Sequence, residues 1–157
     1  MEIQHSRVNA RTNAKGEPIL LPDQNRALWD HLLIGHGLKA LETARGLAPS
    51  PGPYVLQAEI AACHARARKA DETEWARIAA LYGALGALTP SPVIELNRAV
   101  AVAMADGPAA GLALVDALAS APALKNYHLL PSVRADLLGK LGRHGEAQEE
   151  FMRAAGM

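Results

Sequence analysis

The chain has 157 residues, of which half are hydrophobic but only 4% aromatic, and its formal net charge is zero. This length suits a single domain with a continuous core. An apolar content made of Ala, Leu and Val suits closely packed helices better than a β-sandwich. Because there is no basic excess, the chain is not expected to bind nucleic acid directly. Its single cysteine excludes an internal disulfide and fits a reducing cytoplasm.

Residues 1–22 differ from the rest of the chain and are expected to form an N-terminal arm or linker. They are mostly polar and contain the turn signal NAKGE at residues 13–17, which fits at most a weak hairpin. The arm carries three basic residues: Arg7, Arg11 and Lys15. These side chains are expected to be solvated, with contact to an acidic partner as the alternative.

Residues 23–157 are expected to form one all-α domain, an antiparallel, right-handed, tetratricopeptide-like stack of about seven helices. The first helix would run from an N-cap at Asp23 to about Leu47 and bury one residue in every three or four. The expected buried stripe is Trp29, Leu33, Gly37, Ala40, Ala44 and Leu47. Its glycine would let a neighbouring helix come close, and SPGP at residues 50–53 would then break the helix.

Three helix pairs are expected after this helix, over residues 54–88, 92–119 and 127–155. The clearest stops are Gly107 and Gly142, which are 35 positions apart (142 − 107). That spacing is close to the ~34-residue period of tetratricopeptide repeats. Such units cannot bury their apolar faces alone, so they stack on one another and present a surface. The expected inward side chains of the last pair include Leu137, Leu141 and Phe151.

The sequence contains no standard catalytic or metal-binding motif. Cys63 and His64 are adjacent, so on a helix they diverge by about 100° and do not share a metal. We therefore expect no catalytic residue, no metal, no cofactor and no enzymatic activity. The alternative is a small enzyme that uses His36, His64 or the carboxylates of residues 71–74, which would require a deep pocket.

Five polar residues are candidates for contact with a partner protein. Aligning the helix pairs places Gln57, Asn97 and Ser132 at equivalent positions, with offsets of 40 and 35. Each lies in the first helix of its pair, and first helices line the concave face of such stacks. Arg98 adjoins this set, and His64 follows Gln57 by seven residues on one polar streak. The alternative is that Asn97 and Arg98 only satisfy helix ends and polar gaps between helices.

Several segments resemble the signatures of one protein family. They are LPDQNRALWD at residues 21–30, GPYVLQAEIAA at 52–62, SPVIELNRAV at 91–100 and YHLLP at 127–131. Together they resemble the C-terminal tetratricopeptide-like extension of extracytoplasmic-function (ECF) RNA polymerase sigma factors, over nearly the whole chain. The departures are Asn25 and Glu74, where the family usually has Asp, and Glu59, where it usually has a small apolar residue.

The resemblance implies a bacterial, cytoplasmic parent protein that recognises promoters and starts transcription. Its promoter-reading and polymerase-binding regions would precede this chain, and residues 1–4 would end a helix of that preceding segment. The chain itself would be a regulatory, protein-interaction domain that contacts the sigma-factor core or RNA polymerase and binds neither DNA nor membrane. Exposed terminal repeats often pair, which would give a homodimer. The alternative is a stand-alone helical-repeat adaptor unrelated to transcription.

Overall fold

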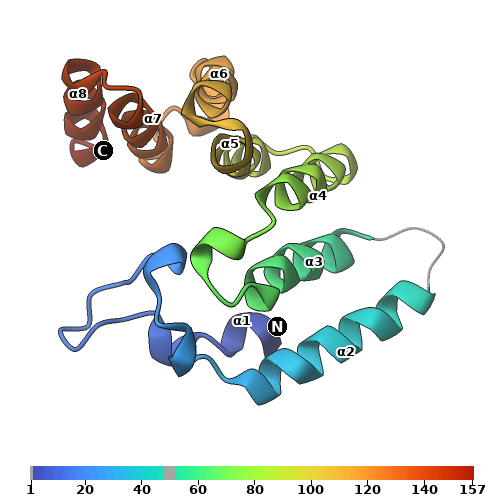
Figure 1. Cartoon of the computed structure of the whole chain (residues 1–157). Helices are drawn as coiled ribbons and strands as arrows, with labels where there is room; N and C mark the ends of the chain where they lie inside the picture. The colour runs from blue at the N-terminus through green and yellow to red at the C-terminus, as the bar shows by residue number, and fades with distance from the viewer. Residues whose placement is uncertain (1, 48–51) are drawn as a thin grey trace. The chain divides into compact units, whose positions relative to one another are not determined.

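The computed structural model describes residues 2–47 and 52–157, and this part of the chain is all-α, as predicted. It contains eight α-helices and five short 3₁₀ turns, and its one β-bridge is an isolated antiparallel pair between Thr12 and Pro18. The chain divides into two compact units, Met1–Glu74 and Trp75–Met157, which are described separately (Figure 1). Part of the expected SPGP break lies outside the described residues, and the handedness of the stack stays a prediction.

Three helices build the first unit. They are α1 (Glu2–His5), α2 (His31–Leu47) and α3 (Pro53–Arg66). Figure 1 shows α1 between α2 and α3, and a small apolar core lies where the three meet. Its buried members are Ile3, Leu41 and Ala62. Part of the expected N-terminal arm therefore packs into the unit, and the compact units divide after residue 74 rather than after residue 22.

The prediction that Asp23 caps the first long helix is wrong, because α2 begins at His31. Trp29 has an extended backbone with ψ of 138°, and the residues before it form two short 3₁₀ turns. The carboxylate of Asp30 caps α2 instead. Its Oδ1 accepts hydrogen bonds from two backbone N–H groups of the first turn, at 3.0 and 3.1 Å.

The buried stripe of α2 also has a different register from the predicted one. Ile34 and Leu41 are buried and Leu38 packs against them, whereas Leu47 is exposed. The difference arises because Trp29 precedes the helix and does not belong to its helical period. The expectation for Gly37 is confirmed, since a Cβ atom there would lie 2.4 Å from Cγ1 of Ile3 in α1.

Five helices build the second unit. They are α4 (Trp75–Leu88), α5 (Pro92–Asp106), α6 (Pro108–Leu118), α7 (Leu129–Lys140) and α8 (His144–Ala155). Each packs against the next, and a continuous core runs through α5, α6, α7 and α8. The pairs predicted over residues 92–119 and 127–155 are confirmed. The pair predicted over residues 54–88 is divided, because α3 belongs to the first unit and α4 to the second.

Two glycines end helices, as predicted. Gly107 has φ of +105° and Gly142 has φ of +78°, a region that side chains disfavour. After α7, the N–H of Gly142 donates to the carbonyl of Gly139 at 3.0 Å, and the N–H of Arg143 donates to that of Leu138 at 2.9 Å. This pair of bonds is the Schellman pattern of a helix C-terminus.

Fewer side chains at the C-terminal end of α7 and on α8 are buried than the sequence predicted. Ala147 of α8 is buried and Leu137 of α7 is only 3% exposed, but Phe151 is 52% exposed and Leu141 38%. The prediction that Phe151 and Leu141 point inward is therefore wrong. The reason is position: α8 is the last helix of this unit, so one of its faces is open, and Leu141 lies beyond the end of α7.

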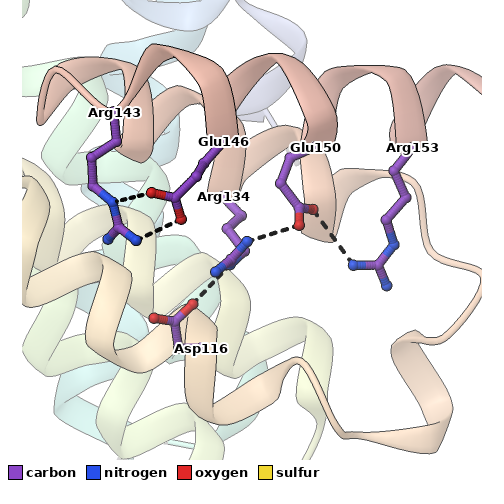
Figure 2. A network of polar contacts seen from close by, with 6 residues as sticks. All are labelled: Asp116, Arg134, Arg143, Glu146, Glu150 and Arg153. Carbon is purple, nitrogen blue, oxygen red and sulfur yellow. Dashed lines mark hydrogen bonds and ion pairs between the residues drawn. The ribbon is translucent and has the colours of Figure 1, made fainter.

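A network of ion pairs joins three helices of the second unit (Figure 2). Arg134 of α7 donates from Nε to Asp116 of α6 and from Nη1 to Glu150 of α8, both at 2.8 Å. Arg153 lies 3.5 Å from the second oxygen of Glu150. The hydrogen bond to Asp116 is the main reason that the pKa of Arg134 is raised. The network therefore fixes the polar edge where α6, α7 and α8 meet.

Candidate functional site

The signature at residues 21–30 has a structural role in the first unit. Nη1 of Arg26 donates to the carbonyls of His64 and Ala67, at 2.9 and 3.0 Å, and so caps the C-terminal end of α3. Its guanidinium carbon lies 4.4 Å from the centroid of the buried Trp29 ring, a favourable cation–π arrangement. The side chain of Asn25 accepts a hydrogen bond inside the following 3₁₀ turn. These residues fasten α3 to the segment that leads into α2.

His64 lies beside this fastening and is half-buried. Burial lowers the pKa of its ring to about 4, and the positive charges of Arg7 and Arg26 add to the shift. The ring is therefore neutral at pH 7. The backbone carbonyl of His64 also accepts a hydrogen bond from Arg26. His64 therefore helps to end α3, in addition to being a candidate for partner contact.

Glu59, one of the three residues that depart from the pattern of the resembled family, is buried in α3. Both of its carboxylate oxygens accept hydrogen bonds from the guanidinium of Arg45 in α2, which raises the pKa of Arg45. A buried carboxylate is costly unless it is paired. Glu59 therefore forms a polar link between α2 and α3 instead of altering an exposed surface.

A groove of about 710 Å³ lies among the three helices of the first unit. Its lining includes the start of α1, small residues of α2 and the first two turns of α3. The lining includes Gly37, Ala40, Ala44, Tyr54, Gln57 and Ala58. Tyr54 is 86% exposed, and among the described lining residues Glu2 alone is charged. The groove therefore offers an apolar surface with walls of short side chains.

Gln57 is brought to this groove, and the three candidates in the second unit are not. Asn97 is exposed on α5. Arg98 is half-buried and forms an ion pair with Glu95 of the same helix at 3.2 Å. The hydroxyl of Ser132 in α7 donates to the carbonyl of His128, the residue that precedes this helix, at 2.8 Å. The five candidates therefore fall into two units, with Gln57 and His64 in the first.

The groove was not predicted from the sequence. One signal was present, because small residues recur at helical spacing on both walls: Gly37, Ala40 and Ala44 on α2, and Ala58 and Ala61 on α3. Such faces allow helices to approach closely. The sequence prediction concerned Gly37 alone, and it did not identify α1, which lies at the expected end of a preceding helix, as the neighbour of Gly37.

The described part of the chain offers neither a clustered metal site nor a helix suited to a membrane. Residues 2–47 and 52–157 contain no group of three or more His, Cys, Asp or Glu side chains placed to hold a metal ion. None of the helices in these ranges combines the length and apolar character that crossing a membrane requires.

Comparison with known proteins gives a family match and a relative. Residues 1–45 match a family described as a family of unknown function (DUF6596). Over 152 residues the chain is 46% identical to an uncharacterized protein of Rhizobium meliloti (strain 1021). The alignment covers 97% of this chain and 35% of the relative, so the chain spans about a third of the length of that protein. No solved structure matches the chain.

Proposed function

We propose that this chain is the C-terminal regulatory, protein-interaction domain of an ECF-type RNA polymerase sigma factor in the bacterial cytoplasm. The observation that carries the proposal is the signature at residues 21–30, which resembles that of the family's extension. Its side chains Asn25, Arg26, Trp29 and Asp30 each take part in holding the first unit together. The length of the Rhizobium relative agrees with a chain that belongs to a larger protein.

The surface of the chain favours a protein partner over a nucleic acid. The formal net charge is zero, whereas binding to a phosphate backbone normally needs a basic face. Several arginines of the second unit are also held in ion pairs with carboxylates, as Arg98 and Arg134 illustrate. The proposed partners are the core regions of the sigma factor or RNA polymerase. Asn97, which is exposed on α5, is the candidate contact that a substitution tests most directly.

The test uses the full-length parent protein and its own promoter. Deletion of this chain should change the amount of transcript made by purified RNA polymerase, while the isolated chain should not bind the promoter DNA. Asn97→Arg should weaken binding between the full-length factor and its partner by about tenfold if Asn97 lies in the interface. The matched control is Asn126→Arg, at another exposed asparagine of the second unit, which should leave binding unchanged.

Three results would contradict the proposal. They are an unchanged transcript after deletion, tight and salt-sensitive binding of DNA by the isolated chain, and a gene that encodes no sigma core. The last result would favour the alternative, a stand-alone helical-repeat adaptor. No cofactor or catalytic step forms part of the proposal.

A further inference from the structure

The short helix α1 occupies one end of the groove in the first unit. Its C-terminal end is tied down, because the N–H of Asp30 donates to the carbonyl of Ser6 at 2.7 Å. Ile3 rests on Gly37, at a separation that leaves no space for a side chain on α2. The groove lies toward the other end of α1, because Ile3 lies against Gly37 and the groove lining continues along α2 from Gly37 to Ala44, away from Asp30. A helix that continued α1 in the N-terminal direction would therefore enter the groove.

The walls beyond α1 have the form that a third helix requires. On α2 the lining runs from Gly37 to Ala44, a rise of about 10 Å or two helical turns. On α3 it runs from Ala61 back to Tyr54, again two turns. Because most of these side chains are short, the axis of an added helix can come close to both walls. The exposed ring of Tyr54 would be covered by such a helix.

We propose that the groove binds an apolar helical segment that directly precedes α1 in a longer protein and continues α1 as one helix. The direction of α1 and the apolar walls support this occupant over an unrelated partner. The inference goes beyond the proposed function, because it holds for any parent protein in which a segment precedes α1. With that segment in place, the first unit would be a complete three-helix layer.

The experiment measures hydroxyl-radical labelling of Tyr54 by mass spectrometry in the full-length protein. The segment should protect Tyr54, so that it reacts at least about fivefold more slowly than after unfolding in urea. Tyr127 of the second unit, which is half-buried, is the internal control for radical dose. Labelling of folded Tyr54 at the rate expected of a free, exposed tyrosine would overturn the proposal, as would a gene that begins at Met1.

Substitutions in the groove identify what protects Tyr54. Ala40 is exposed in this structure, so Ala40→Glu should leave the fold intact and place a carboxylate against the apolar segment. Labelling of Tyr54 should then rise about fivefold. Ala44→Trp, which fills the groove, should have the same effect by exclusion. Thr43→Glu is the matched control, because Thr43 is an exposed residue of α2 outside the groove lining.

Two further outcomes separate this inference from its competitors. If protection of Tyr54 disappears on dilution, a second copy of the protein covers the groove and the proposal is wrong. If Tyr54 is protected but deletion of the chain leaves transcription unchanged, the inference stands while the proposed function fails. Circular dichroism of each variant checks that loss of protection does not come from unfolding.

Discussion

The packing of α5 against α6 depends on the missing side chain of Gly111. A Cβ atom there would lie 2.4 Å from Cβ of Ala103 and 2.8 Å from the carbonyl oxygen of Ala99. Because that oxygen belongs to the backbone of α5, a rotamer change cannot relieve the overlap, and the two helices must move apart. Gly111→Ala should therefore destabilise the second unit, although alanine is the better helix former.

The size of the effect follows from two opposing contributions. Overpacking of a core costs about 1–3 kcal/mol, and contact with backbone places this site near the upper end. Alanine regains about 1 kcal/mol of helix propensity, so the net loss should be about 2 kcal/mol. Gly139 in α7 is the matched control, since a Cβ there meets nothing within 4 Å. Gly139→Ala should stabilise the protein by about 0.4–1 kcal/mol.

The assay is equilibrium unfolding in urea, followed by circular dichroism and by tryptophan fluorescence. Each unit contains one tryptophan, Trp29 in the first and Trp75 in the second. When the substitutions are made in a Trp29→Phe variant, tryptophan fluorescence therefore reports the unfolding of the second unit alone. The midpoint should fall for Gly111→Ala and rise for Gly139→Ala, with the slope m unchanged. The close approach of α5 and α6 would be refuted if both substitutions raised the midpoint.

Three further predictions concern the core, a helix stop and pH. Leu137→Ala should lower the free energy of unfolding by about 2–5 kcal/mol, because it leaves a cavity in the core. Leu141→Ala, at a half-exposed side chain, should lower it by less than half as much. Equal losses would contradict the assignment of Leu137 to the inward face of α7. Gly142→Val should lower the thermal midpoint, since a β-branched residue is strained at φ of +78°; an unchanged midpoint would remove the helix-stop assignment. The folded state keeps the pKa of His64 near 4, below its unfolded value of 6.5. The neutral His64 ring should therefore make its full contribution to the free energy of unfolding above pH 6.5, and this contribution should be lost as the pH falls toward 4. His64→Gln should reduce that loss when urea midpoints at different pH values are compared, and an identical loss would show that His64 does not cause it.

Local signals in the sequence were sufficient to predict most helices. Pro92 and Pro108 each occupy the first position of a helix, where a missing N–H costs nothing. Pro53, which was expected to belong to a break, also opens a helix. Gly107 and Gly142 end helices because they accept positive φ. These signals act within a few residues, so they can be interpreted without knowledge of the tertiary structure.

Long-range contacts explain where the sequence prediction failed. Asp23 looked like a helix cap, but the extended backbone at Trp29 delays α2 until Asp30 can cap it. That conformation places Trp29 under Arg26, which donates hydrogen bonds to carbonyls 38 and 41 residues away, at the C-terminal end of α3. Nothing in the local pattern indicates such a contact, and the register of the α2 stripe was shifted for the same reason.

The candidate site was predicted only in part. Aligning helix pairs by spacing assumed one continuous array, so Gln57 was treated as equivalent to Asn97 and Ser132, although Gln57 belongs to the other compact unit. The exposure of Gln57 and Asn97 fits a contact role. The groove depends on where α1 lies. The family resemblance implied a helix end at residues 1–4, but a four-residue helix carries too little periodicity to show which face it packs.

The fastening built by Asn25, Arg26, Trp29 and Asp30 affects how distant relatives should be compared. A protein that retains these four residues would retain the contacts that hold α3 to the segment before α2, whatever molecule it recognises. Exposed residues such as Asn97 do not contribute to these contacts. A sequence search with this signature would thus find proteins that share the architecture of the first unit. Classifying those proteins by the molecule they bind would require comparison of their exposed residues instead.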